Sequence, residues 1–294
     1  MIKIAKSLIK FFLVFIVDVI EKSSSGKNIL FSVLFTLRFH LLLIKMKIFN
    51  KKYSSLGGIK FHFNNFRETK VILREIFFEE CYKLPLGNVP KRIIDGGANI
   101  GLATLYFKSV YPNAEVLAFE PNEYAHNFLI KNLKANQISG VKVFKAALSG
   151  HSGKLKFNVC PDELMASTAT NRLKIREVES NEMLVDAVIL SDYLDQRVDI
   201  LKLDIEGAES GVLAEVEHKL NRVKYLFLEM HYTQGDDSND IGLIFQILQK
   251  HGFEYHVRSS SSGGNDRFSP FKKIEPISSF LIFARNINFK VEKD

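Results

Sequence analysis

The chain has 294 residues, of which 46% are hydrophobic and 25% are charged, so it is a globular protein rather than a disordered one. Much of its net charge of +7 lies near the N-terminus, and no stripe of basic and aromatic residues crosses the rest. We therefore expect no nucleic-acid partner. Its two cysteines are far apart and lack metal-ligand spacing, which favours reduced thiols in a cytoplasmic protein.

Residues 1–52 form an apolar and basic extension that we expect to be helical. Charged side chains interrupt its two apolar runs, Leu8–Ile20 and Ile29–Ile44, so neither reaches the about 18 uninterrupted residues that a membrane-spanning helix needs. Two interpretations stay open. The helices cap the core or form the arm of a homodimer, or they lie on the inner face of the cell membrane as interfacial helices attracted by anionic lipid.

Residues 53–90 form a short lead-in to the main domain. The alternating residues Ile59–Phe63 follow a pair of glycines and predict a strand or hairpin. The apolar spacing over Glu68–Tyr82 predicts a helix. A segment with two prolines and a glycine, 85–90, then indicates a linker before the main domain, 91–288.

From Arg92 onward strands and helices alternate, which predicts a mostly parallel sheet with helices on both faces. The loop expected over the substrate site is Cys160–Glu182, which is polar and has no clear periodicity. The expected strands are 92–94, 115–119, 141–145, 155–159, 200–203 and 224–230, and the pair 254–258 and 280–284 closes the sheet in antiparallel fashion. The expected helices are 99–111, 123–136, 209–220 and 241–252.

A glycine-rich turn follows the first expected strand of the sheet. Its sequence is Asp-Gly-Gly-Ala-Asn-Ile-Gly (95–101), and a second acid, Glu120, ends the next strand. The glycines permit positive φ and close backbone approach, and the helix expected from Asn99 turns its first N–H groups toward a ligand. Two strand-end acids around such a turn are typical of nucleoside binding in an open α/β sheet.

Three interpretations of this turn are open. It binds a dinucleotide, it binds S-adenosylmethionine, or it only allows the strand and the helix to pack closely. A dinucleotide fingerprint has glycine where this chain has Ala98, and Asp95 at the strand end would repel a pyrophosphate. S-adenosylmethionine (SAM) is cationic at its sulfonium and ammonium groups and has no phosphate. We therefore expect SAM, with Glu120 accepting hydrogen bonds from the ribose hydroxyls.

A second group of acids follows the later strands. Asp204 and Glu206 come directly after one strand, and Glu229 and His231 lie at the end of the next. These side chains could act as general bases or hydrogen-bond the loops, and they could hold a divalent cation, although methyl transfer does not require one. Glu209 suits the N-terminus of the following helix, where an acid complements the helix dipole.

These motifs resemble those of the FkbM family of SAM-dependent methyltransferases. The matching stretches are 94–101, 118–122, 146–150, 201–209 and 228–231, within a resemblance that covers roughly residues 70–285. The family usually has a small apolar residue where this chain has Gly96. The resemblance implies a class I methyltransferase fold, Rossmann-like, with seven strands of which the last is antiparallel. It also implies O-methylation of sugar or polyketide hydroxyls.

The motifs and the resemblance together give two sets of expected site residues. For SAM we expect Asp95, Gly96, Gly97, Ala98, Asn99, Gly101, Glu120, Pro121, Ala146 and Asp204. For catalysis at the acceptor we expect Asp204, Glu206, Glu229 and His231, with no residue assigned to a metal.

The expected reaction is SAM-dependent O-methylation of a hydroxyl on a sugar, a glycan or a related small molecule, by direct displacement. The abundance of Lys, Ile, Phe and Asn suggests a bacterial protein, for which polysaccharide biosynthesis is a setting by analogy only. Two alternatives stay open. One is a dinucleotide-dependent sugar oxidoreductase, although no Tyr-x-x-x-Lys pair occurs in the right region. The other is a non-catalytic, membrane-associated protein that keeps the methyltransferase fold.

Overall fold

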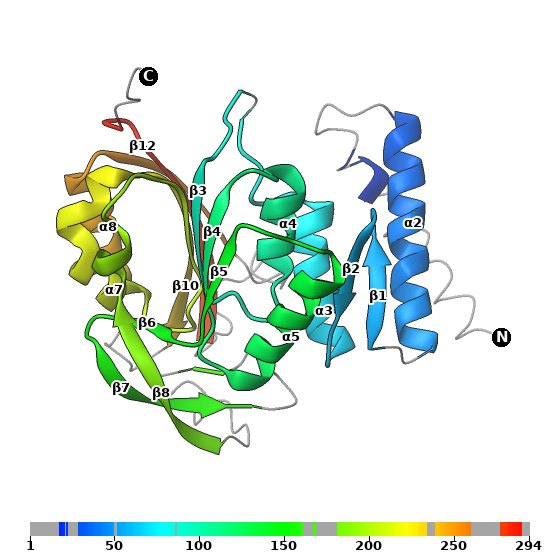
Figure 1. The fold of residues 1–294 in the computed structure, drawn as a ribbon. Coiled ribbons are helices and arrows are strands. Elements are labelled where there is room, and N and C mark those ends of the chain that lie inside the picture. Colours follow the sequence, from blue (N-terminus) through cyan, green and yellow to red (C-terminus); the bar gives the residue numbers. More distant parts are fainter. Residues whose placement is uncertain are drawn as a thin grey trace, which may run out of the picture. The chain divides into compact units, whose positions relative to one another are not determined.

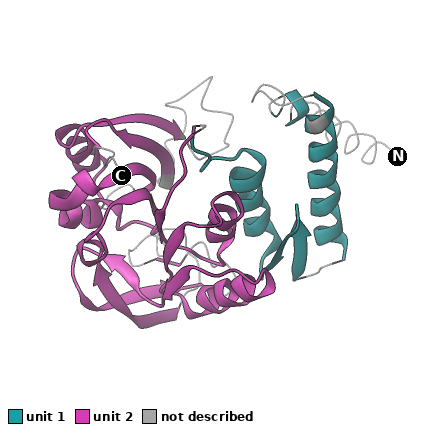
Figure 2. Cartoon of the chain, turned by 45° about the horizontal axis from the view of Figure 1, so that its top comes forward, with its two compact units in different colours: residues 1–84 teal, residues 85–294 magenta. Residues whose placement is uncertain are grey.

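The structure is a computed structural model that describes residues 18–20, 22, 29–49, 52–85, 87–160, 167–168, 181–233, 239–259 and 277–289. Contacts between Cα atoms divide the chain into two compact units, residues 1–84 and 85–294 (Figure 2). The division falls inside the expected lead-in, because the hairpin and helix of that segment group with the preceding helix. Most of the expected loop over Cys160–Glu182 lies outside the described residues.

Unit 1 contains a long helix, a hairpin and a second helix. The hairpin of β1 (Tyr53–Leu56) and β2 (Ile59–His62) turns at Gly57 and Gly58, whose φ values of 58° and 90° match a two-residue turn that needs positive φ at both positions. The next helix, α3 (Phe66–Leu73), begins at Asn65, whose side chain accepts the first free backbone N–H groups. It continues as the π-helical turn η1 (Arg74–Phe78), so the helix expected over Glu68–Tyr82 is present in two parts, which begin at Phe66 and end at Phe78.

The long helix α2 (Ile29–Ile48) lies beside β1 (Figure 1). One of its faces is buried within unit 1, where the Phe39 ring lies 5.1 Å from that of Phe78. Leucine and isoleucine side chains occupy the opposite face and are exposed. Among the described helices, none combines the length and the hydrophobicity that crossing a membrane requires.

Unit 2 is built on a seven-stranded sheet with the order β11-β12-β10-β9-β3-β4-β5 (Figure 1). Strand β12 runs in the opposite direction to the other six strands of this sheet, which confirms the expected class I, Rossmann-like fold with an antiparallel last strand. The strands are β3 (Arg92–Gly96), β4 (Glu115–Phe119), β5 (Val141–Phe144), β9 (Val198–Leu203), β10 (Val223–Thr233), β11 (Phe253–Ser259) and β12 (Ile277–Asn286). The central strands are apolar and buried on both sides, as a parallel sheet between two layers of helices requires.

Helices cover both faces of this sheet (Figure 1). On one face lie α4 (Leu102–Val110) and α5 (Glu123–Ala135), and on the other lie α7 (Glu209–Val216) and α8 (Ile241–Lys250). Helix α4 begins three residues later than expected, because Asn99 and Gly101 take positive φ and cannot belong to a right-handed helix. The helix expected to end at Leu220 changes at Glu217 into the 3-10 helix η4 (Glu217–Arg222).

The chain after β5 forms a second, smaller sheet with the strand order β6-β8-β7. Of its strands, β6 (Ala147–Ser149) pairs in parallel and β7 (Gly153–Val159) pairs antiparallel with β8 (Asn181–Ile189), and the turn η3 (Leu190–Tyr193) follows. The sequence predicted β7 but not β8. The first four residues of β8 are all exposed, so this half of the strand lacks the alternation of burial that identifies a strand in a sequence.

Candidate active site

Four neighbouring parallel strands, β4, β3, β9 and β10, bring the candidate residues to one edge of the sheet. Asp95 lies at the end of β3, Glu120 follows β4, Asp204 follows β9, and Glu229 lies near the end of β10. Because ligands of open α/β sheets bind at the carboxyl ends of the strands, this edge is the candidate active site.

The glycine turn packs against the backbone that follows β9. Gly97 has a φ of 72°, and a Cβ atom added to it would lie 1.8 Å from the carbonyl oxygen of Asp204. The turn is fixed from its other side, because the N–H groups of Gly97 and Ala98 donate to the Phe119 carbonyl at 3.0 and 2.9 Å. A Cβ on Gly96 would lie 2.8 Å from a terminal carbon of Leu148 and 3.1 Å from the Lys202 carbonyl oxygen, so the space at this position is also tight. The turn is therefore a close junction between β3, β4 and β9.

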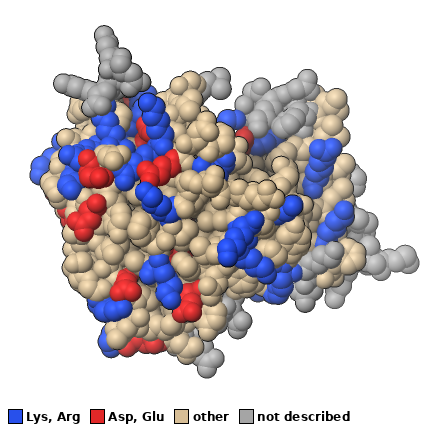
Figure 3. All heavy atoms as spheres, viewed as in Figure 1, with Lys and Arg blue, Asp and Glu red and all other residues tan. Residues whose placement is uncertain are grey.

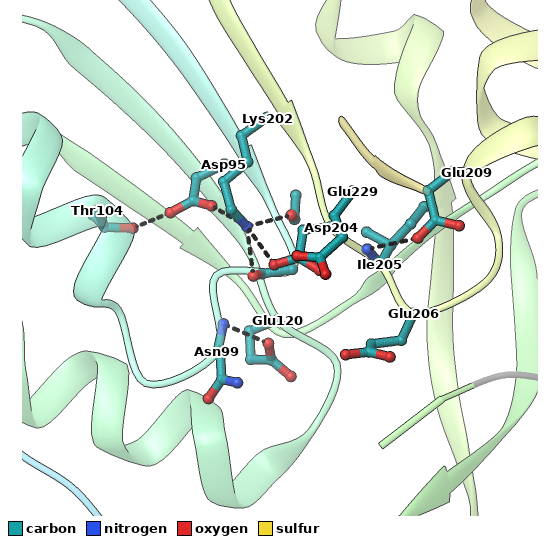
Figure 4. Close-up of polar contacts among 12 residues, drawn as sticks. Asp95, Asn99, Thr104, Glu120, Lys202, Asp204, Ile205, Glu206, Glu209 and Glu229 are labelled. Carbon is teal, nitrogen blue, oxygen red and sulfur yellow. Dashed lines mark hydrogen bonds and ion pairs between the residues drawn. The ribbon is translucent and has the colours of Figure 1, made fainter. Parts of the chain in front are cut away.

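Asp95 is fully buried below this turn, with both oxygens beside donors. One oxygen accepts a hydrogen bond from the Thr104 hydroxyl at 2.6 Å, and the other lies 3.2 Å from the Lys202 ammonium (Figure 4). The Lys202 ammonium also donates to the carbonyls of Gly96 and Gly97 and lies 3.5 Å from an Asp204 oxygen. The negative charge of Asp95 is thus compensated inside the protein, and direct contact of Asp95 with a cationic ligand stays a prediction.

Lys202 is a buried cation whose charge is maintained by its neighbours. Burial acts to lower its pKa, but Asp95 and Asp204 outweigh this and hold the pKa above its usual value. The sequence analysis did not select Lys202. The available signal was a lysine inside the apolar run Ile200–Leu203 of a central strand, because such a position is almost never charged unless a partner is present.

Glu120 fixes the second part of the turn. Its two oxygens accept from the backbone N–H groups of Asn99 at 2.7 Å and Asn122 at 2.8 Å. Burial raises its pKa to about 7, although these two hydrogen bonds act in the opposite direction. Asn99 takes a φ of 50°, a left-handed conformation that asparagine tolerates and that presents its N–H to Glu120.

The other expected SAM residues lie along the same edge. Gly101 has a φ of 88° and precedes the first residue of α4. Pro121 follows Glu120, between β4 and the N-cap residue of α5. Ala146 is buried between β5 and β6. Their contacts with SAM stay predictions.

Three carboxylates surround one nitrogen of His231 at the ends of β9 and β10. The His231 Nε2 atom lies 3.5 Å from Glu206, 3.7 Å from Glu229 and 3.9 Å from Asp204. The imidazole is buried, whereas the three carboxylates are partly exposed. Glu206 has a φ of 57°, and left-handed conformations of non-glycine residues concentrate at functional sites. All four expected catalytic residues are therefore together.

The other nitrogen of His231 is bound by a buried acid. Nδ1 lies 2.9 Å from Glu209, which also accepts from the N–H groups of Ile205 and Gly207. The side chain of Asn239 donates both to Glu209 and to the carbonyl of His231. Glu209 thus binds the loop before α7 and orients the histidine ring. Asn239, like Lys202 and Thr104, was not selected from the sequence.

The acids around His231 set its protonation. Burial acts to lower the pKa of His231, but Glu206 and Glu209 outweigh it and raise the pKa to about 10. Burial and the neighbouring Asp204 carboxylate raise the pKa of Glu229 to about 7. At neutral pH the imidazole therefore carries a proton, and Glu229 lies near its midpoint of titration, where a general base is most effective.

The cluster can perform two kinds of chemistry. A carboxylate can accept the proton of a hydroxyl group that binds at this edge. Asp204, Glu206 and His231 also each offer one ligand atom, and these atoms lie within 4.8 Å of one another, so they could hold a divalent cation. Comparable groups of acids also occur without a metal, so the geometry alone assigns none.

Comparison with known proteins identifies the family. The sequence model described as the Methyltransferase FkbM domain matches residues 95–255, more than half of the chain. The methyltransferase sdnD of Sordaria araneosa is 35% identical over 235 residues, which are 69% of this chain and 88% of that protein. The 31-O-demethyl-FK506 methyltransferase FkbM of Streptomyces tacrolimicus is 28% identical over 224 residues, which are 64% of this chain and 83% of that protein.

A solved structure shows a weaker similarity. The methyltransferase FkbM of Methylobacillus flagellatus is 14% identical, with a TM-score of 0.47 and coverage of 83% of this chain and 57% of that one. The match to the family model and the sequence identity to sdnD establish the family without this structural similarity. The chain belongs to the FkbM methyltransferase family.

Proposed function

We propose that the protein uses SAM to methylate a hydroxyl group of a sugar or a related small molecule. The observation that carries this proposal is the division of the strand-end acids into two sets. Asp95 is held by a hydrogen bond from Thr104 and an ion pair with Lys202, and Glu120 accepts from two backbone N–H groups, whereas Asp204, Glu206 and Glu229 surround one imidazole and are partly exposed. The first set fits a cofactor bound in one fixed position, and the second fits a polar acceptor.

The residues of the turn fit SAM. Glu120 would accept hydrogen bonds from the ribose hydroxyls, using acceptor capacity that its two backbone partners leave unused. The carboxylates of Asp204 and Glu206 would give the sulfonium and ammonium groups a negative environment. SAM supplies an electrophilic methyl group, so the protein has to align the acceptor oxygen with it and receive the proton.

The acid cluster fits a hydroxyl acceptor. Carboxylates accept hydrogen bonds from several hydroxyls at once, which suits a sugar. Glu229 would take the acceptor proton as the new bond to carbon forms, because its pKa of about 7 lets it be ionised at neutral pH. His231 would keep the neighbouring carboxylates in place as a cation. The name of the 31-O-demethyl-FK506 methyltransferase, which designates an O-methyl product, also supports an oxygen acceptor.

A thermal-shift experiment with SAM, S-adenosylhomocysteine and NAD tests the cofactor. We expect stabilisation by the first two and none by NAD, and stabilisation by NAD alone would favour an oxidoreductase and reject the proposal. Mass spectrometry of candidate sugars and glycans incubated with SAM then tests the acceptor. The expected product is heavier by one methyl group at an oxygen, and a product methylated only at nitrogen or carbon would contradict the proposed reaction.

A further inference from the structure

An exposed apolar stripe runs along the whole of helix α2. Its residues are spaced alternately by four and three positions, which places them on one line of a helix. Their side chains are between 39% and 69% exposed, whereas the opposite face of the helix is buried. The stripe consists of Leu30, Leu34, Leu37, Leu41, Ile44 and Ile48.

Such a stripe is unusual on the surface of a water-soluble protein. Single exposed leucines need no explanation, but a contiguous apolar patch marks a surface that another apolar phase covers. The folding of unit 1 does not require it, since Phe39 and Met46 already bury the other face of α2. The stripe therefore points to a partner outside the described part of the chain.

The charges of α2 restrict what that partner is. The helix contains no Asp or Glu, and its charged residues Arg38, Lys45 and Lys47 are exposed. Where Figure 3 shows the surface over α2, the coloured charges are basic. On a helical wheel Arg38 and Lys45 flank the stripe on one side, and Lys47 lies on the other.

We infer that α2 lies on an anionic lipid surface, with its leucine stripe in the acyl boundary and its basic side chains at the headgroups. An apolar face flanked by lysine and arginine is the arrangement of interfacial helices. A second copy of the chain is less suitable, because it would bring further basic groups of α2 to the stripe and no acid from that helix. The absence of a membrane-crossing helix among the described residues agrees with attachment to the surface.

Vesicle sedimentation of the full chain tests this inference. We expect binding to vesicles of phosphatidylcholine mixed with phosphatidylglycerol, and at least about tenfold weaker binding to phosphatidylcholine alone, since each basic group contributes about fivefold near an anionic surface. The double variant Leu37→Glu/Leu41→Glu is expected to lose binding to both. Leu184→Glu is the control, because Leu184 is a leucine of β8 in unit 2 that is 69% exposed, against 42% for Leu37 and 46% for Leu41, and lies outside the stripe.

A second variant separates charge from apolar contact. Lys45→Glu/Lys47→Glu leaves the stripe intact and is expected to remove the preference for phosphatidylglycerol. Equal sedimentation of the wild type and Leu37→Glu/Leu41→Glu would overturn the inference, as would equal binding of the wild type to both kinds of vesicle. Sedimentation velocity tests whether a second copy of the chain covers the stripe instead. A wild type that is dimeric and does not bind vesicles, together with a monomeric double leucine variant, would assign the stripe to that second copy.

Discussion

The two halves of the strand-end edge contain similar numbers of acids, but these acids differ in their burial and in their hydrogen bonds. Around β3 and β4, Asp95 and Glu120 are buried, and donors face both oxygens of each. Around β9 and β10, Asp204, Glu206 and Glu229 share one imidazole nitrogen at 3.5–3.9 Å, longer than a good hydrogen bond. The first half is preorganised, and the second keeps acceptor capacity for a ligand.

This difference separates two tasks that the proposed reaction needs. A methyl donor that is the same in every turnover is best held by a rigid turn, whereas the acceptor differs between relatives and needs carboxylates that can change partners. Lys202 connects the halves, because its ammonium lies beside Asp95 and Asp204 and donates to the glycine turn. Substitutions in each half should therefore have distinct effects.

The largest effect is expected from Lys202→Met, which removes the cation and leaves Asp95 buried. Breaking a buried ion pair from one side costs about 3–5 kcal/mol, because the remaining charge is uncompensated. Chemical denaturation followed by circular dichroism measures this loss. Lys142→Met is the control, since Lys142 forms an exposed pair with Glu115 and should change the unfolding free energy by less than about 1 kcal/mol. A similar small loss for both variants would contradict the assigned role of Lys202.

The next largest effect is expected from Glu229→Gln in the acceptor half. Removing a general base lowers the turnover rate by about a hundredfold or more, while SAM affinity should stay within a factor of about two. In the wild type the rate should fall about tenfold per pH unit below about 7, because the raised pKa of Glu229 leaves it protonated there. The variant should lose this acidic limb. A variant rate that keeps the same limb would assign the proton transfer to another group.

Much of the fold and part of the site could be predicted from the sequence. β4 has the expected bounds, and the other strands of the sheet differ from prediction by only a few residues, because buried parallel strands between helices are apolar runs with clear ends. The acids could be assigned to the edge, because strand ends fix where side chains emerge. The partners of these acids could not be predicted, since Lys202 reaches Asp95, and Asn239 reaches Glu209, through contacts between segments that are distant in the sequence.

Gly97→Ala tests how tightly the two halves are joined. A Cβ there would lie 1.8 Å from the Asp204 carbonyl at a φ of 72°, so the turn or the segment after β9 must shift. We expect SAM affinity to weaken by more than about tenfold by calorimetry, since the turn and Asp204 would both move. Gly57→Ala is the control, because Gly57 also has positive φ but no atom within 4 Å of an added Cβ. It should cost about 1 kcal/mol of stability and leave SAM binding unchanged.

The smallest effect is expected from Glu120→Gln in the cofactor half. Glutamine keeps the shape of the side chain but offers one acceptor oxygen in place of two, so one of the N–H groups of Asn99 and Asn122 loses its partner. We expect SAM affinity to fall by about tenfold, the cost of a charge-assisted hydrogen bond. Wild-type affinity should also decrease as pH falls through about 7, because Glu120 is then protonated, and the variant should show no such decrease. If calorimetry gave the same pH dependence of SAM affinity for the wild type and the variant, protonation of Glu120 would not be its cause. That result would also contradict the proposed contact of Glu120 with the ribose.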